Sequence, residues 1–155
     1  MTISADRLSN NRREVFAQMA EEIKNSLEFL NMPFVTLALS MEKKDFAPDG
    51  QDNIEFLISA NKGEMPKPLS KIASGGELSR IMLAIKNVLA EKEDTHTLIF
   101  DEIDTGVSGS AAMKIGRLLK ETSVGKQVLC VTHSAQIVAF ADNHLQIEKK
   151  TDESA

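Results

Sequence analysis

Apolar residues recur at helical spacing near the start of the chain. They lie three and four positions apart over Asn10–Met32, which predicts a helix with one apolar stripe. The stripe consists of Phe16, Met19, Ile23, Leu27 and Leu30. Pro33 cannot continue a helix and marks its end. Two interpretations fit this pattern: a surface helix packed on the core, or the end of a coiled-coil arm that enters the domain.

Two segments with alternating apolar residues follow the helix. The alternation over Phe34–Glu42 and again over Asn53–Ala60 predicts two β-strands. The polar stretch between them contains proline, aspartate and glycine at positions 48–50, so we expect a β-hairpin with a long turn. We expect a loop over Lys62–Pro68, which contains both glycine and proline.

From Ser74 onward, helical patterns alternate with short apolar strands. A continuous apolar stripe predicts a long helix that begins at Ser74. The elements expected after it are a strand at Thr97–Phe100, a helix at Ala111–Thr122, a strand at Gln127–Val131, a short helix at Ser134–Asp142 and a last strand at His144–Glu148. This order predicts an α/β fold with a parallel sheet layer flanked by helices.

These patterns divide the chain into three parts. Residues 1–32 form the helix, residues 33–150 form one lobe, and residues 151–155 form a polar tail that we expect to be disordered. A chain of 155 residues, 42% hydrophobic and 26% charged, has the size and balance of one soluble globular domain.

Charge and composition exclude several functions. A net charge of −5 argues against a free-standing DNA-binding module, which usually carries a basic patch. No apolar run approaches the roughly 18 residues of a membrane span, and Met1–Asn11 lacks the apolar stretch of a signal peptide. The single cysteine, Cys130, excludes an intramolecular disulfide and a cysteine-rich metal site. We therefore expect a cytoplasmic protein with no membrane partner.

The start of the long helix is the first segment with candidate chemistry. Ser74, Gly75, Gly76 and Glu77 stand where a helix presents unpaired backbone N–H groups and a partial positive charge, which suits a phosphate. The two glycines let an anion approach the backbone closely. A serine followed three residues later by a glutamate is also an ordinary helix-capping box, so both interpretations remain open.

Two apolar strands end in polar side chains. Asp101 and Glu102 directly follow the strand at Thr97–Phe100, at the sheet edge where ligands bind in open α/β folds. Adjacent acids can divide the work there, one holding Mg²⁺ and the other orienting a water. His133 follows the next strand and can contact a phosphate. Taken singly, an acidic strand end of this kind is more often simply solvated, and a lone strand-end histidine is more often a capping or structural residue.

The order of the three segments resembles the ABC-type ATPase heads of the SMC-like family, and RecN in particular. Ser74–Glu77 resembles the signature motif, Leu98–Glu102 the Walker B strand with its catalytic glutamate, Thr105–Ser108 the D-loop, and His133 the switch histidine. The longer strings Lys71–Arg80 and Ile99–Gly109 resemble RecN specifically. The part of the chain that carries these motifs runs from about residue 69 to residue 142.

The resemblance implies a function and assigns roles to residues. Residues 33–150 would be the C-terminal lobe of an ATPase head of the P-loop fold, with ATP and Mg²⁺ as cofactors. Asp101 would hold the metal, and Glu102 and His133 would be catalytic. The residues that would bind the ATP of a second head are Ser74, Gly75, Gly76, Glu77 and Ser108. The intact protein would act on DNA in recombination and double-strand-break repair, at the nucleoid.

The chain departs from the family pattern in two respects. It lacks the Gly-x-x-x-x-Gly-Lys-Ser/Thr loop that cradles the β- and γ-phosphates. In the family that loop lies in an N-terminal lobe beyond a long coiled coil, so we expect the chain to be the half after the coiled coil and inactive alone. Many ABC proteins also have an aspartate where this chain has Ser108, which leaves its contact with a second head open.

Three other functions are compatible with parts of the pattern. A structural SMC-like chromosome clamp shares the same motifs, and the length of the coiled coil would distinguish it. A transporter subunit would need a phosphate loop upstream in the same short chain, and the helix and hairpin argue against it. The chain on its own would be a non-catalytic interaction fragment.

Overall fold

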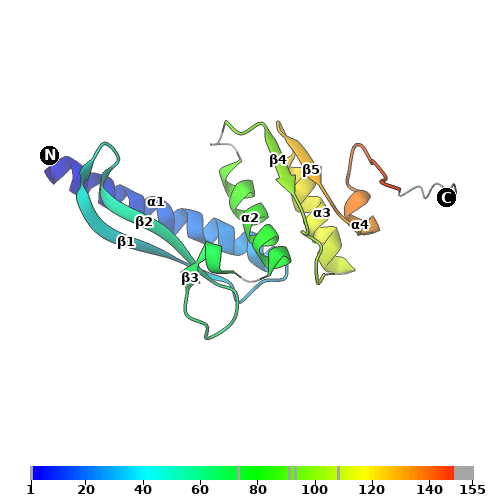
Figure 1. Cartoon of the computed structure of the whole chain (residues 1–155), viewed down its shortest axis with the longest axis horizontal. Coiled ribbons are helices and arrows are strands. Elements are labelled where there is room, and N and C mark those ends of the chain that lie inside the picture. The colour runs from blue at the N-terminus through cyan, green and yellow to red at the C-terminus, as the bar shows by residue number, and fades with distance from the viewer. Residues whose placement is uncertain (1, 73, 91, 93, 108, 149–155) are drawn as a thin grey trace, which may run out of the picture.

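The chain forms an elongated molecule with a helix and a long hairpin at one end and a small parallel sheet at the other (Figure 1). The computed structural model describes residues 2–72, 74–90, 92, 94–107 and 109–148. The predicted tail at residues 151–155 lies outside these ranges. None of the described helices is long and apolar enough to cross a membrane.

Helix α1 spans Thr2–Phe29 and starts well before the predicted Asn10. The prediction failed because residues that break the apolar pattern are nevertheless buried: Ser9 is only 5% exposed. The predicted stripe is confirmed at Ile23, Leu27 and Leu30, which are fully buried or nearly so. The helix ends at Phe29, before Pro33, and Asn31 just beyond it has a φ of 63°, the left-handed conformation typical of the residue that follows a helix C-terminus.

Strands β1 (Thr36–Ala47) and β2 (Gly50–Ser59) pair antiparallel and extend much further than predicted. The expected long turn is wrong, because both strands continue through the polar stretch and only two residues separate them. Gly50 takes a φ of 101° at this turn, which favours glycine. Part of the predicted loop also pairs with β2, as the short strand β3 (Lys67–Pro68).

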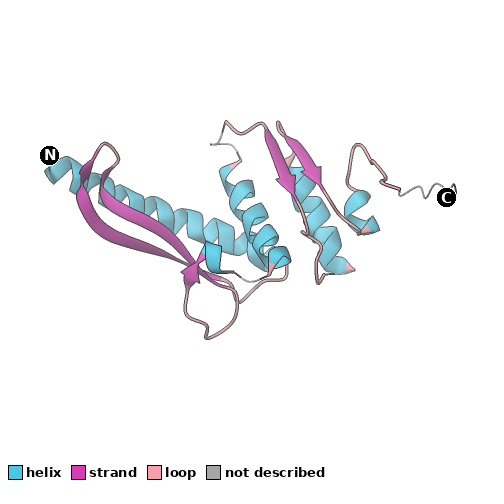
Figure 2. Ribbon diagram, in the orientation of Figure 1, coloured by secondary structure: helices cyan, strands magenta, loops and turns pink. Residues whose placement is uncertain are grey.

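The second half follows the predicted order closely. A 3-10 turn, η1 (Leu69–Lys71), leads to helix α2 (Gly75–Leu89). Strand β4 (Thr97–Phe100), helix α3 (Ser110–Thr122), strand β5 (Gln127–Cys130) and the short helix α4 (Ala135–Val138) complete the fold (Figure 2). Strands β4 and β5 are parallel, as predicted.

One face of the β4–β5 sheet is buried and the other is open. Leu98 and Phe100 of β4 join the core with residues of α2 and α3. Ile99 pairs in register with Leu129 on the opposite face, where both side chains are exposed. The sheet thus packs against helices on one side only.

The last predicted strand, His144–Glu148, does not form. Its two apolar residues, Leu145 and Ile147, are about nine-tenths exposed, at 90% and 93%. A β-strand needs a neighbouring edge with which to exchange hydrogen bonds, and no described strand lies beside this segment. The helix predicted at Ser134–Asp142 forms only over Ala135–Val138.

Candidate functional site

The start of α2 is built as a capped helix N-terminus. Ser74 has extended backbone angles, and its hydroxyl accepts a hydrogen bond from the Glu77 amide at 3.3 Å. Ser74 is therefore the N-cap of α2, which confirms the serine half of the predicted capping box. A hydroxyl engaged in this way stays at the helix end, so capping also presets its position for any anion that approaches the helix.

The two glycines of this segment contact the loop after β4. A Cβ atom on Gly76 would lie 2.9 Å from both the Cβ atom and the backbone oxygen of Thr105, which is too close for any side chain. A Cβ atom on Gly75 would lie 2.5 Å from the Glu102 Oε2 atom. Gly76 thus allows the backbone of one segment to approach the other, and Gly75 leaves room for the carboxylate of Glu102.

The two acids after β4 adopt different conformations. Asp101 accepts a hydrogen bond from the Glu102 amide through Oδ1, at 2.9 Å. Glu102 has a φ of 56°, the left-handed region that a non-glycine residue rarely adopts, and strain of this kind concentrates at functional sites. Both side chains are exposed at the surface.

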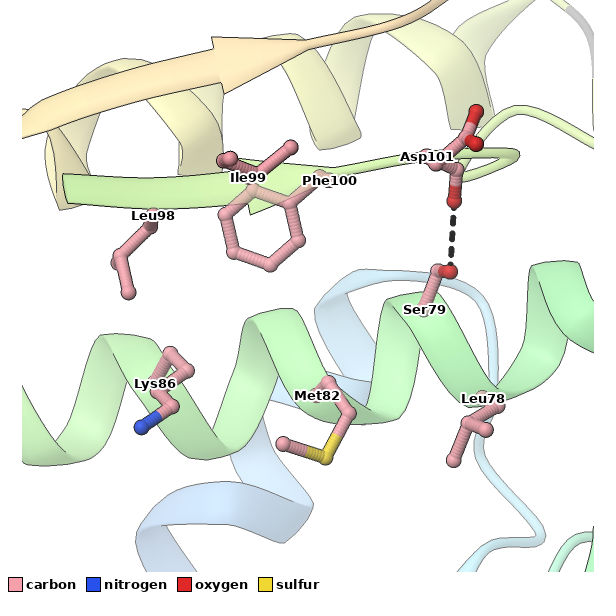
Figure 3. Close-up of a pocket in the computed structure, with 8 residues that line it drawn as sticks. All are labelled: Leu78, Ser79, Met82, Lys86, Leu98, Ile99, Phe100 and Asp101. Atoms are coloured by element: carbon pink, nitrogen blue, oxygen red, sulfur yellow. Dashed lines mark hydrogen bonds between the residues drawn. The ribbon is translucent and has the colours of Figure 1, made fainter.

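Helix α2 holds the acidic loop through two further side chains. The Ser79 hydroxyl donates to the Asp101 backbone oxygen at 2.7 Å, as Figure 3 shows. Arg80 is buried, and its Nη1 donates to the backbone oxygens of Ile103 and Thr105 at 3.3 and 2.9 Å. Burial lowers the pKa of Arg80, although the charge of Glu77 opposes this effect. An arginine remains protonated in proteins, so Arg80 is a buried cation that binds two carbonyl groups.

A carboxylate connects the acidic loop to the histidine turn. Asp104 Oδ2 accepts hydrogen bonds from the Thr132 hydroxyl at 2.8 Å and from the His133 amide at 2.9 Å. Burial disfavours the charged form of Asp104, but these hydrogen bonds, together with the charge of His133, outweigh burial and keep the pKa below its usual value. The Thr132 oxygen in turn accepts from the Ser134 amide, just before α4.

Asp101 is the candidate metal ligand. No group of three histidine, cysteine, aspartate or glutamate side chains that could hold a metal occurs among the described residues. Mg²⁺ usually takes only one or two carboxylates and completes its shell with waters and phosphate oxygens of a nucleotide. An exposed single aspartate at a strand end fits that kind of site and does not fit a metal cage formed by the protein alone.

The structure brings together most of the residues that the sequence predicted. Glu102 lies against Gly75, and the histidine turn is tied to the same loop through Asp104. Ser108 lies outside the described residues. No role for Arg80 or Asp104 was predicted from the sequence. Two features of the sequence could have indicated them. Arg80 is a charged residue on the buried face of the predicted helix, one turn after Gly76, and Asp104 is a third acid in the segment that follows β4.

Comparison with known proteins shows which proteins this chain is similar to. No protein-family model matches the chain. The chain is 41% identical to the DNA repair protein RecN of Halalkalibacterium halodurans, over 97% of this chain and 27% of that protein. It is 40% identical to RecN of Bacillus subtilis, over 97% of this chain and 29% of that protein. The sequence of this chain is thus similar to part of the RecN proteins. The resemblance to the C-terminal half of a RecN head is thereby confirmed.

Solved structures that resemble this RecN-like chain include SMC heads. The head domain from Pyrococcus furiosus, solved bound to the C-terminal domain of ScpA, has a TM-score of 0.60 at 22% identity, over 84% of this chain and 31% of that one. The head domain from Pyrococcus yayanosii has a TM-score of 0.59 at 21% identity, over 88% of this chain and 26% of that one. At these identities the likeness shows the fold, which is that of an SMC-like head lobe.

Proposed function

We propose that the RecN-like chain is the C-terminal lobe of an ATPase head that uses ATP to dimerise and then hydrolyses it, in double-strand-break repair and recombination. One observation carries the proposal. The glycine-rich start of α2, the acidic end of β4 and the histidine turn after β5 form one connected network, through Gly75 with Glu102, Gly76 with Thr105, and Asp104 with His133. Candidate signature, Walker B and switch residues that lie far apart in the sequence thus share one surface.

The ATP site of this lobe would be completed by a second lobe, and the open sheet face supports such a partner. The uncovered face of the sheet carries Ile99 of β4, Leu129 of β5 and Val131 just after β5, at 69%, 47% and 54% exposure. Each of these two strands pairs only with the other among the described residues, so one edge of each is open. An N-terminal lobe with the phosphate-binding loop would cover this face and extend the sheet.

A groove beside the open edge of β4 points to the same partner. Figure 3 shows it between β4 and α2. Its lining residues are Leu78, Ser79, Met82, Lys86, Leu98, Ile99, Phe100 and Asp101. Apolar side chains form most of the lining, and Asp101 stands at its end, where the candidate metal site begins. A covering lobe would therefore bring its phosphate loop close to Asp101.

Under this proposal two heads share each nucleotide. Ser74, Gly75 and Gly76 would bind the γ-phosphate of ATP held by the other head, at the positive end of α2. Asp101 would hold Mg²⁺, which when bound neutralises charge on the phosphates. Glu102 would orient the attacking water and His133 would contact the γ-phosphate. Glu102 now lies against Gly75 of its own chain, so its side chain would have to rotate toward the nucleotide.

Residues outside this chain complete the activity. The chain spans 27% and 29% of the RecN proteins cited above. ATP hydrolysis, dimerisation and contact with DNA would therefore belong to the intact protein, in the cytoplasm at the nucleoid. The isolated chain would neither bind Mg·ATP tightly nor hydrolyse it.

Replacement of Glu102 by glutamine in the full-length protein tests the proposal. We expect Glu102→Gln to reduce ATP turnover by at least about 100-fold, because the water loses its orienting base, while ATP-driven dimerisation persists. Glu121→Gln is the matched control, since that glutamate forms an exposed pair with Arg117 on α3. Steady-state turnover and sedimentation with ATP are the measurements. Turnover of Glu102→Gln at the wild-type rate would exclude the proposed role of Glu102.

A further inference from the structure

The histidine turn is attached to the acidic loop by one oxygen atom. Asp104 Oδ2 accepts both the Thr132 hydroxyl and the His133 amide, at 2.8 and 2.9 Å. The donors come from consecutive residues after β5, and the acceptor comes from the loop after β4. The hydrogen bonds between β4 and β5 end before this turn. The Asp104 carboxylate therefore determines where the His133 backbone lies relative to Asp101 and Glu102.

The loop that presents Asp104 is itself held on both sides. Arg80 donates to the backbone oxygens of Ile103 and Thr105, the residues before and after Asp104. Thr105 also packs on Gly76 of the same helix. Asp104 thus stands on a segment that is fixed to α2, and it connects that segment to the histidine turn.

We propose that Asp104 is a positioning residue for ATP hydrolysis, which acts through His133 by fixing the histidine turn against the loop that carries Asp101 and Glu102. The inference deepens the proposed function and rests on it. A catalytic side chain displaced by about 1 Å can lose a large part of its effect, because the reacting groups must stay aligned. Loss of Asp104 would leave the Thr132 hydroxyl and the His133 amide without their acceptor, and the turn would move.

Two substitutions at Asp104 separate charge from geometry. Asp104→Ala removes the acceptor, and we expect kcat to fall about 10- to 100-fold, the range that corresponds to losing hydrogen bonds to a charged group. Asp104→Asn keeps an oxygen that can accept both bonds, so we expect it to restore kcat to within about threefold of wild type. We expect KM for ATP to stay within about twofold in both, because the phosphate loop lies elsewhere.

A double-substitution cycle with His133 tests whether Asp104 acts through the histidine. In a His133→Ala background, Asp104→Ala should lower kcat by no more than about twofold further, since the residue it positions is gone. Multiplicative losses in the double variant would overturn the inference. Asp49→Ala is the matched control, because that aspartate pairs with Lys44 at the hairpin turn, far along the chain from the site.

A measurement independent of turnover separates the two proposals. The His133 amide should exchange its hydrogen at least about tenfold faster in Asp104→Ala than in the wild type, and Asp104→Asn should restore most of the protection. Unchanged exchange would overturn the inference whatever the kinetics. Faster exchange in a protein whose turnover is insensitive to His133→Ala would instead show that the proposed function of His133 is wrong while the structural link holds.

Discussion

The two ends of the molecule satisfy their polar and apolar groups in different ways. At the α1–hairpin end, residues 2–59, polar side chains find partners within the chain: Asp52 accepts from Ser9 at 2.8 Å and from Arg12 at 3.0 Å. Phe16 of α1 stacks on Phe56 of β2, with ring centroids 5.7 Å apart. At the sheet end, residues 97–148, the apolar residues of one sheet face have no cover within the described chain.

This difference distinguishes side chains that are buried when the chain folds from side chains that a partner lobe would bury. Helix α1 and the hairpin cover each other along one face, where Ile23, Leu27 and Ile58 are buried, although Phe46 on the outer part of β1 is 57% exposed. A two-stranded parallel sheet, by contrast, needs cover on both faces. The residues proposed for ATP chemistry all stand at the uncovered end or at its boundary with α2. We therefore expect substitutions in the α1–hairpin region to affect folding of the chain. Substitutions on the open sheet face should instead affect its assembly with a partner lobe.

A pair of substitutions gives the largest expected contrast between the two ends. Leu27 is fully buried, so Leu27→Ala should lower the free energy of unfolding by about 2–5 kcal/mol. Ile99 is 69% exposed, so Ile99→Ala should change it by no more than about 0.5 kcal/mol. Urea denaturation of the 155-residue chain, followed by circular dichroism, measures both.

The same pair also tests for the missing lobe. In the full-length protein Ile99→Ala should become destabilising, by about 1 kcal/mol or more, because the proposed lobe buries this side chain there. An equally small effect in both contexts would show that the sheet face stays open in the full-length protein, which would contradict the proposed covering lobe. Leu129→Ala should behave like Ile99→Ala, since the two residues are register partners on that face.

The fold was predictable where local pattern and packing agree. Strand β4 was predicted residue for residue, and α3 and β5 to within one residue at one end, because their apolar residues face a core formed by neighbouring elements. The hairpin was predicted too short because its outer half is polar. Residues 42–47 of β1 are exposed, and the two buried residues near the turn, Gln51 and Asp52, are held by hydrogen bonds to Asp6 and Ser9. Alternation of apolar residues contains no signal for such contacts. The strand expected at His144–Glu148 depends on an edge that no described strand provides.

The candidate site, too, was predictable only in part. The sequence indicated the residues that end strands and start helices, because glycine, acid and histidine in those places have known chemistry. It did not indicate how they are connected. Arg80 and Asp104 act across separations of 23 to 29 residues, and which carbonyl or amide they meet depends on how α2 and the two strands pack.

Reactivity of the single cysteine probes how firmly the sheet end is closed on its helix side. Burial, followed by the negative charges of Asp104 and Asp101, raises the pKa of Cys130 to about 11. At pH 8 about one thiol in a thousand would then be ionised, against about a quarter for an ordinary cysteine. Iodoacetamide should therefore modify Cys130 at least about 100-fold more slowly than it modifies glutathione, and addition of urea should abolish the difference. Modification at the ordinary rate would mean that the sheet separates from its helices in the isolated chain.

The smallest expected effect concerns the pH dependence of the α1–hairpin end. The hydrogen bond from Ser9, and then the contact with Arg12, lower the pKa of Asp52 below its ordinary value of 3.8, despite the opposing effect of burial. A carboxylate with a lowered folded-state pKa stabilises the fold at pH values above 3.8, and this contribution is lost as the pH falls through the folded-state pKa. The urea midpoint should therefore fall as the solution is acidified below about pH 4.

Ser9→Ala should make this fall shallower, because it removes the main cause of the lowered pKa. Ser123→Ala, whose hydroxyl donates to a backbone oxygen of α3, should leave the slope unchanged. If Ser9→Ala gave the same slope as the wild type and Ser123→Ala, Asp52 would not link α1 and the hairpin as an ionised group. The contact between them would then depend on their apolar side chains.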